Sequence, residues 1–158
     1  VHLKNLTSLK LLRLSGTAVT DEGLVHLKGL QLESLYIPQG AQTDLGLKYY
    51  LAALKTPTAL HLSDWRVTDA GMVHLKNLTS LQLLSLSGTA VTDGGLVHLK
   101  QLTSLKRLDL IGCKITDEGL VHLKQLTNLQ KLILYRTNIT DAGVADLQMA
   151  LPNCEILH

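Results

Sequence analysis

Histidines recur once per repeat in one aligned column of the sequence, an arrangement that could bind a metal. The column contains His2, His26, Tyr49, His74, His98, His122 and Asp146. Each of these residues is expected on a separate helix, about 8–10 Å from the next, whereas zinc binds its ligands at about 2.0–2.1 Å. No expected helix carries two ligands four residues apart. We therefore interpret the column as a solvent-facing or half-buried helix position and predict no metal site.

A threonine–aspartate pair also recurs once per repeat, and a ladder of carboxylates could bind calcium. The pairs are Thr20/Asp21, Thr43/Asp44, Thr68/Asp69, Thr92/Asp93, Thr116/Asp117 and Thr140/Asp141. Either side chain can cap the free N–H groups at a helix start, and aspartate also suits the positive end of the helix dipole. Helix capping explains the ladder residue by residue, so we expect neither a bound ion nor a cofactor.

Catalytic chemistry has one candidate pair, His61 and Asp64, which could exchange a proton. The chain has no nucleophile elbow, phosphate-binding loop or metal motif. Catalytic sites are normally enclosed, and nothing in the sequence predicts a pocket around these two residues. We expect no catalytic residues and no enzyme activity.

The two cysteines, Cys113 and Cys154, fall in repeats two apart. Their strands are therefore expected about 9–10 Å from each other, and a disulfide needs Cα atoms within about 7 Å. We predict free thiols. Free thiols weakly favour the cytoplasm, and nothing else in the sequence indicates a localisation.

Leucine dominates the composition. The 158 residues include 38 leucines, one tryptophan, four tyrosines and no phenylalanine. A core built from one side chain suits a structure in which the same packing problem recurs. The net charge of +2 gives too weak a field for a dedicated nucleic-acid binder. Polar residues interrupt every apolar run, so no membrane insertion is expected.

The sequence repeats with a period near 24 residues. Six complete units begin at Leu9, Leu32, Pro57, Leu81, Leu105 and Leu129. Residues 1–6 match the end of a preceding unit, and residues 153–158 match the start of a seventh. We interpret residues 1–158 as a single repeat array, with termini that look truncated from a longer one.

Each unit combines two periodicities. Leucines two apart, such as Leu12 and Leu14, predict a short strand. A turn and the threonine–aspartate pair follow, and then leucines three apart, such as Leu24 and Leu27, predict one face of a helix. A glycine two residues after each aspartate is expected to let adjacent coils approach closely.

The consensus L-x-x-L-x-L-x-x-[T/C]-x-[V/I]-T-D-x-G-L-x-x-L resembles a leucine-rich repeat over essentially the whole chain. The period and the Ser-Gly-Thr turns are similar to bacterial arrays. The stretch 108–117, with Cys113, is similar to the cysteine-containing subfamily of ubiquitin-ligase substrate receptors and to ribonuclease-inhibitor-like repeats. The resemblance implies an α/β solenoid, a curved horseshoe fragment with a parallel β-ribbon on its concave face and short helices on its convex face.

One position departs from the family pattern, which usually has asparagine or cysteine after the strand. Here the position holds Thr17, Gly40, Trp65, Thr89, Cys113 and Thr137. Gly40 and Trp65 cannot offer a hydrogen bond to the neighbouring coil in the usual way. We therefore expect local irregularity around the second and third repeats.

The exposed strand columns vary from repeat to repeat, whereas the leucine columns barely change. The varied columns include Arg, Tyr and Trp, the residue types that dominate interface energies. For Trp65 a second interpretation is equally open, in which it turns inward and fills space. The predicted partner-binding residues are Arg13, Tyr36, Gln39, His61, Asp64, Trp65, Arg107, Asp109, Ile133, Tyr135 and Arg136.

These observations favour a non-catalytic protein–protein interaction module that binds a mildly acidic protein on its concave surface. One alternative is the substrate-recognition part of a larger ubiquitin-ligase-like or effector protein. A second is a structural array that self-associates end to end, since uncapped leucines such as Leu3 and Leu157 would otherwise be exposed.

Overall fold

A computed structural model describes residue 3, residue 6 and residues 8–158 of the chain. The chain divides into two compact units, Val1–Pro57 and Thr58–His158, and each is described here by itself. Residues 1, 2, 4, 5 and 7 lie outside the described part, and with them the first member of the histidine column, His2.

From Ser8 onward, the described part of the first unit contains two parallel strands and three helices. In chain order these are β1 (Leu11–Arg13), the 3-10 helix η2 (Glu22–Leu27), β2 (Ser34–Tyr36), the 3-10 helix η3 (Gln39–Ala41) and α1 (Asp44–Ala53). The strands pair with Leu12 opposite Leu35, and α1 packs against η2.

The second repeat has the irregular shape that its sequence predicts. The 3-10 helix η3 precedes its helix α1, which has 10 residues. The helices α2 (Asp69–Met72) and α3 (Asp93–Leu96) of later repeats have 4 residues each, while α5 (Asp141–Ala150) of the sixth repeat also has 10. The end of α1 is tied back to the strand side, because Leu32 donates a backbone hydrogen bond to Ala53 (2.8 Å) and accepts one from Lys55 (2.8 Å). The extra helical turn therefore still closes the coil.

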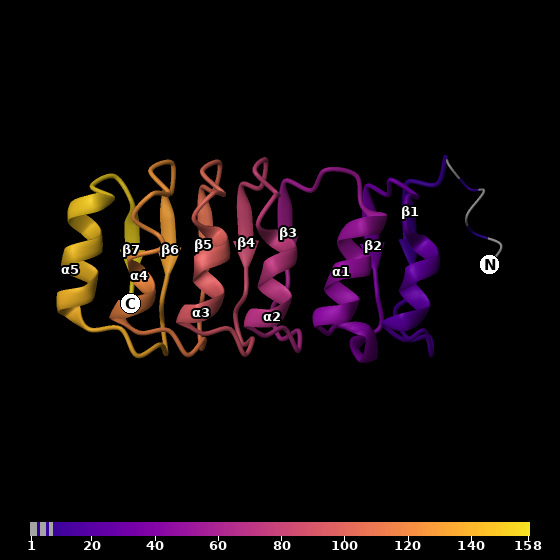
Figure 1. Ribbon diagram of the computed structural model, residues 1–158, viewed down its shortest axis with the longest axis horizontal. Helices are drawn as coiled ribbons and strands as arrows, with labels where there is room; N and C mark the ends of the chain where they lie inside the picture. Colours follow the sequence, from indigo (N-terminus) through magenta and orange to yellow (C-terminus); the bar gives the residue numbers. More distant parts are fainter. Residues whose placement is uncertain (1–2, 4–5, 7) are drawn as a thin grey trace. The chain divides into compact units, whose positions relative to one another are not determined.

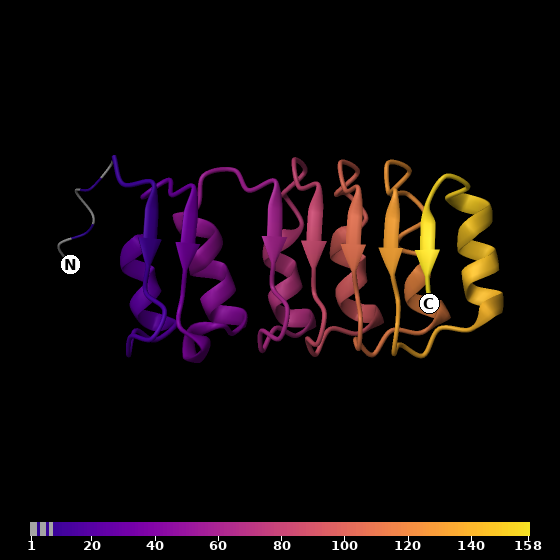
Figure 2. The same ribbon diagram turned by 180° about the vertical axis from the view of Figure 1, so that it is seen from behind.

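The second unit contains a five-stranded parallel sheet in chain order (Figures 1 and 2). Its strands are β3 (Ala59–His61), β4 (Leu83–Ser85), β5 (Arg107–Asp109), β6 (Lys131–Ile133) and β7 (Glu155–Leu157). Residues 153–158 thus supply a strand, as the partial seventh repeat predicts. The predicted parallel strands are present as one sheet of two strands and one of five.

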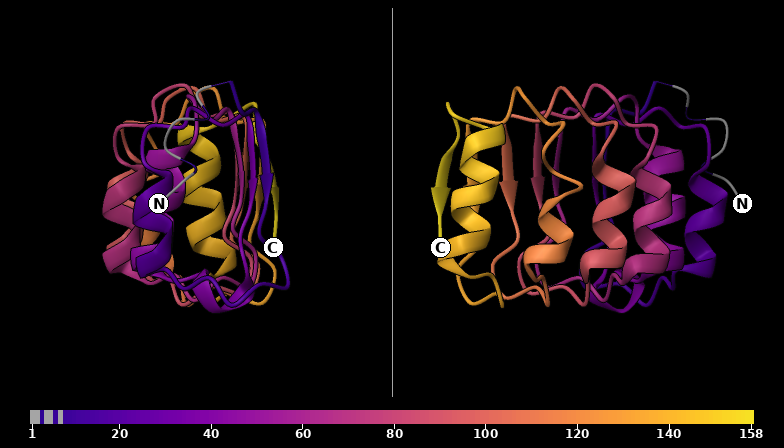
Figure 3. Two further views of the ribbon diagram at one scale, coloured as in Figure 1. Left: turned by 90° about the vertical axis from the view of Figure 1, so that its right-hand side faces the viewer. Right: turned by 60° about the vertical axis from the view of Figure 1, so that its left-hand side comes forward.

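Short helices form a second layer on one side of the five-stranded sheet (Figure 3). They are α2 (Asp69–Met72), η4 (Val73–Leu75), α3 (Asp93–Leu96), η5 (Val97–Leu99), α4 (Asp117–Leu120) and α5 (Asp141–Ala150). A strand that is followed by a helix and then pairs in parallel with the next strand gives the predicted α/β architecture.

The leucines of each repeat fill the space between the two layers. Leu84, Leu108 and Leu132 lie opposite one another in register, and each is fully buried. The row two residues further along, Leu86, Leu110 and Leu134, is buried as well. Because a 24-residue period brings the same leucine to the same register, each coil packs like the previous one, and no aromatic residue is needed to fill a mismatch.

None of the helices that the structure describes is both long enough and apolar enough to cross a membrane.

Candidate functional site

The threonine of each threonine–aspartate pair caps the helix that follows it. Thr43, Thr116 and Thr140 accept hydrogen bonds from Gly46 N (3.0 Å), Glu118 N (3.3 Å) and Gly143 N (3.2 Å), respectively. Thr68 and Thr92 act in the same way on α2 and α3. Capping is therefore satisfied by threonine, which leaves the aspartates free for another role.

The aspartates connect each coil to the next. The Asp69 carboxylate accepts hydrogen bonds from the backbone N–H (2.8 Å) and hydroxyl (2.5 Å) of Thr92. Asp93 accepts the same two bonds from Thr116 at 2.9 and 2.7 Å. Their use as caps of their own helices, which the sequence left open, is therefore wrong for these two residues. The carboxylate ladder is a set of contacts between coils.

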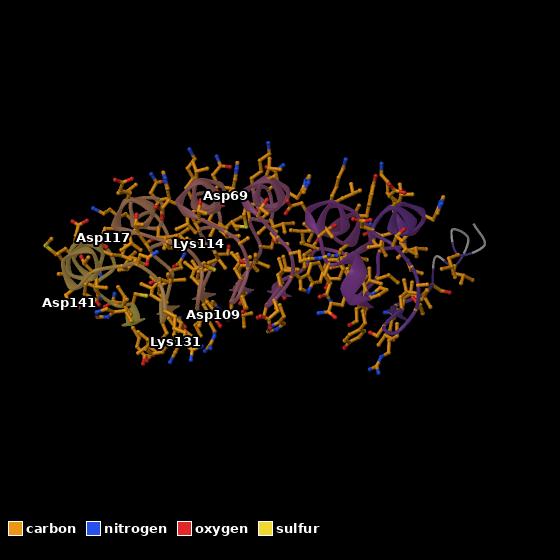
Figure 4. All side chains as sticks on the ribbon, turned by 90° about the horizontal axis from the view of Figure 1, so that it is seen from below. Asp69, Asp109, Lys114, Asp117, Lys131 and Asp141 are labelled. Carbon is orange, nitrogen blue, oxygen red and sulfur yellow. The ribbon has the colours of Figure 1, made fainter. Side chains whose placement is uncertain are left out.

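The last of these contacts repeats the geometry. Asp117 accepts hydrogen bonds from Thr140 N (2.9 Å) and Thr140 Oγ1 (2.6 Å). Both hydrogen bonds lower the pKa of Asp117, and the bond from the Thr140 hydroxyl has the larger effect. Figure 4 places Asp69 and Asp117 on the helix side of the second unit. In the first unit Asp21 accepts a bond from Thr43 Oγ1 (2.7 Å), and it also caps its own helix through Glu22 N (2.9 Å).

In the last three repeats, the glycine after the threonine–aspartate pair makes room for the carboxylate of the preceding coil. A Cβ atom on Gly119 would overlap the carboxylate of Asp93, and one on Gly143 would overlap that of Asp117. At Gly95 it would lie 2.6 Å from Asp69 Oδ1. The close approach predicted from the sequence is therefore confirmed, and the group that approaches is an aspartate side chain.

The histidine column lies on the helix side of the coils. His26 is exposed, while His74, His98 and His122 are half-buried. Over the described part of the chain, no three histidine, cysteine, aspartate or glutamate side chains come together as a metal site would need. Lys124, which lies near this column, forms an ion pair with Asp146 (2.7 Å).

Both cysteines are buried and free. Cys113 Sγ donates to Leu86 O (3.2 Å), and burial raises the pKa of its thiol. Burial, together with the neighbouring charge of Glu155, raises the pKa of Cys154 to about 11. Since the thiolate is the reactive form, neither cysteine is suited to act as a nucleophile.

The outward side of the five-stranded sheet is the candidate binding surface, and we call it the strand face. Its side chains come from β3–β7 and from the turns that follow them. Of the predicted binding residues, those exposed on this face are His61, Asp64, Arg107, Tyr135 and Arg136, and Asp109 is half-buried. Figure 4 places Asp109 and Lys131 on this side, away from the helices.

Trp65 is 7% exposed, so the interpretation in which it fills space is the correct one. It occupies the position held by Thr89 and Cys113 in the next two coils, and both of these are buried too. The backbone N–H of Trp65 donates a hydrogen bond to the backbone carbonyl of Leu62 (3.1 Å), and the chain turns inward there. A binding role for Trp65 as an exposed anchor is therefore wrong.

Ile133 is 5% exposed, which contradicts its predicted exposure. It lies in register between Asp109 on β5 and Leu157 on β7. Neighbouring strands are only about 4.8 Å apart, so an aliphatic side chain of this size is covered by those on either side of it. Ile133 can serve as the floor of a contact surface but not as its projecting part.

Hydrogen bonds link serines and an aspartate across three strands. Ser63 Oγ lies 2.8 Å from Ser85 Oγ, and Ser85 donates to Asp109 Oδ2 (3.4 Å). Ile111 N donates to the other oxygen of Asp109 (3.1 Å). Each carboxylate oxygen of Asp109 therefore accepts one hydrogen bond. The serines were not among the predicted residues, although their places in aligned exposed columns could have indicated the link.

Positive charge gathers at β5 and β6. Arg107 lies directly opposite Lys131 in the sheet register. Lys131 Nζ forms an ion pair with Glu155 Oε2 (2.9 Å). Within the part of the chain that is described, neither Arg107 nor Arg136 takes part in an ion pair.

The first unit brings together its own predicted residues. The Arg13 guanidinium lies over the Tyr36 ring, 4.8 Å from its centroid, and Tyr36 is 47% exposed. Gln39 is exposed at the start of η3. Beside them, Lys10 and Glu33 form an ion pair at 2.6 Å, and this hydrogen bond and charge lower the pKa of Glu33.

Together these features define a class: a repeat protein of strand–turn–helix coils, held together by leucine rows and by aspartate–threonine contacts. The family model for the leucine-rich repeat matches residues 5–28, 77–100 and 101–124. The chain is a leucine-rich repeat protein. No curated protein matches the sequence significantly.

Solved structures of bacterial repeat proteins share the fold. A leucine-rich repeat protein of Leptospira interrogans is 28% identical with a TM-score of 0.64, over 99% of this chain and 38% of that one. Internalin C2 of Listeria monocytogenes is 26% identical with a TM-score of 0.64, over 99% and 63%. An internalin, InlF, from the same species is 21% identical with a TM-score of 0.62, over 98% and 49%. The chain thus spans less than two thirds of each relative.

Leucine-rich repeats and internalin-like neighbours support a protein-interaction module in general terms.

Proposed function

We propose that this protein binds a protein partner through the strand face. The observation that carries the proposal is the contrast between two sets of side chains on the same strands. The inward rows are leucine in nearly every coil and are buried. The outward column through His61, Ser85 and Asp109 changes at each step. Variation confined to the exposed side gives each strand a different chemical group to present.

The exposed groups are of the kinds that give interfaces their affinity. Tyr135 is 44% exposed on the strand face, and Arg107 and Arg136 are exposed beside it. Tyrosine and arginine are enriched among residues whose truncation costs an interface most. In the first unit, the stacked pair of Arg13 and Tyr36 consists of the same residue types.

Catalysis is not part of the proposal. His61 and Asp64 are both exposed, and the Asp64 carboxylate is directed toward Gly88 of the next coil. An exposed pair of this kind lacks the enclosure that general acid–base chemistry needs.

The test compares the two sides of the same sheet. Arg107→Ala/Tyr135→Ala removes two exposed groups from the strand face, and Lys76→Ala/Lys100→Ala removes two exposed groups from the helix side. Each variant and the unaltered chain are immobilised and used to capture proteins from bacterial and animal cell lysates, with quantification by mass spectrometry. We expect a set of captured proteins that the strand-face pair loses at least tenfold and the helix-side pair retains. Loss with the lysine pair alone would place binding on the other side and overturn the proposal.

A further inference from the structure

We propose that the part of the strand face formed by β5, β6 and the turns that follow them binds an extended acidic segment that carries a central apolar side chain. This inference rests on the proposed function and adds the chemical class of the partner. The residues that define it, here called the basic patch, are Arg107, Ile111, Lys131, Tyr135 and Arg136.

Two charges of the basic patch, those of Arg107 and Arg136, are not paired within the described chain. Arg107 and Lys131 lie directly opposite each other on neighbouring strands, and like charges at such positions destabilise a sheet. Glu155 pairs with Lys131. Asp109 accepts hydrogen bonds from Ser85 and Ile111 N. Arg107 is thus left without a carboxylate in the described structure, so a carboxylate from a partner would relieve the repulsion.

Arg136 provides a second positive charge, in the turn after β6. Its φ is +58°, and the matching positions in the three preceding coils are Asp64, Gly88 and Gly112, with φ of +61°, +71° and +70°. The left-handed conformation therefore belongs to this position of the repeat and is not specific to the patch. Arg136 is exposed and takes part in no ion pair within the described chain, so its charge is available to a partner.

Apolar groups lie between the two positive ends of the patch. Tyr135 is 44% exposed, Ile111 is half-buried beside it, and Ile133 forms the floor at 5% exposure. The strand β6 ends at Ile133, and Tyr135 and Arg136 lie in the turn that follows it. An acidic segment would place one carboxylate at Arg107 and another at Arg136, with an apolar side chain over Tyr135.

The opposite end of the same face has a different character. His61, Ser63 and Asp64 on the β3 side include no arginine or lysine. The two ends of the strand face therefore differ in charge, and an acidic segment would contact the face at β5 and β6 rather than along its whole width.

The experiment is a selection from a display library of random twelve-residue peptides, using the full chain as bait. Selections are repeated with Arg107→Gln/Arg136→Gln, with Tyr135→Ala, and with Lys76→Gln/Lys100→Gln, which removes the same amount of charge from the helix side. We expect peptides enriched at least threefold in aspartate and glutamate around an apolar residue. Their affinity for the arginine variant should fall at least tenfold and that for Tyr135→Ala at least fivefold, with the lysine variant unchanged.

The outcomes separate the inference from the proposed function. Peptides that lose binding with Tyr135→Ala but are not acidic would overturn the acidic segment and leave strand-face binding standing. Peptides affected only by the lysine variant would overturn both, as would the absence of any enriched peptide. A single-stranded oligothymidine that binds more tightly than the selected peptides would also overturn the inference, since it would identify the patch as a polyanion site.

Discussion

The contact between Asp93 and Thr116 allows a prediction about two substitutions. The effect of one of them on the free energy of unfolding should change sign when the other is present. Asp93→Ala removes both hydrogen bonds between α3 and the start of α4. Gly119→Ala places a methyl group where the Asp93 carboxylate lies, so it breaks the same contact from the other side. In the double variant the carboxylate is absent and the methyl group has space.

The magnitudes follow from the geometry. Each hydrogen bond to a carboxylate is worth about 1.5–3 kcal/mol when buried, and because Asp93 and Thr116 are half-buried we take about 1 kcal/mol for each. Asp93→Ala should therefore cost about 2 kcal/mol of unfolding free energy. Gly119→Ala should cost about 1–2 kcal/mol, since the loss is partly offset by alanine's better helix propensity. Once Asp93 is removed, the nearest remaining obstacle is the flexible Leu96 Cδ1 at 3.1 Å, so the double variant should cost only about 1 kcal/mol.

The measurement is urea unfolding followed by tryptophan fluorescence. Trp65 is the single tryptophan of the chain and is buried in the same unit as Asp93. Free energies are obtained by linear extrapolation at matched m-values. The control is Glu118→Ala, an exposed residue of the same helix, which should change the stability by less than about 0.5 kcal/mol.

The explanation is tested by the sign of the change in unfolding free energy that Gly119→Ala causes in each background. Gly119→Ala should destabilise the unaltered protein and stabilise the Asp93→Ala variant, a coupling of about 2 kcal/mol in a double-mutant cycle. Additive costs, near 3–4 kcal/mol for the pair, would refute the view that this glycine exists to admit the carboxylate.

Three further predictions concern strain and titration. Arg136→Gly should raise the unfolding free energy by about 0.5–1 kcal/mol, because glycine relieves the left-handed backbone; lower stability in the same urea assay would contradict the strain. Cys154 in the native protein should react with iodoacetamide at pH 8 roughly 200-fold more slowly than free cysteine, because a pKa of about 11 leaves little thiolate; mass spectrometry of time points measures this, and fast labelling would exclude the raised pKa. Asp117 has a lowered pKa, so its stabilisation is present above its ordinary value near 4 and lost as the pH falls through the folded value. The difference in urea midpoint between Asp117→Asn and the unaltered chain should therefore shrink between pH 6 and pH 3, and a constant difference would contradict the assignment.

Sequence alone went furthest where a position recurs in every coil. The leucine rows predict both the short strands and the helical faces, because burial follows from the two periodicities. The glycine was correctly linked to close approach between coils. The group that approaches the glycine was not predicted, because it comes from a different repeat. At Gly119 this group is the Asp93 side chain.

The candidate surface shows where such reasoning ends. Alternation along a strand predicts which side of the sheet a residue faces, and it correctly placed Tyr135 and Arg107 on the exposed side. It cannot predict how far neighbours cover a residue, and so Ile133 was expected exposed and is buried. Trp65 was left open for the same reason, because the pattern along its own strand does not tell how far its neighbours cover it.

By itself, the sequence determined the repeat, the α/β class and the family resemblance, because each of them depends on a local periodicity that recurs in every coil. The tertiary structure decided which groups meet. The aspartates connect neighbouring coils, the strands divide into two sheets, and Arg107 faces Lys131 without a carboxylate of its own in the described chain. Those outcomes depend on contacts between residues more than 20 positions apart, where the geometry of the neighbouring coil, rather than the local pattern, sets the distance.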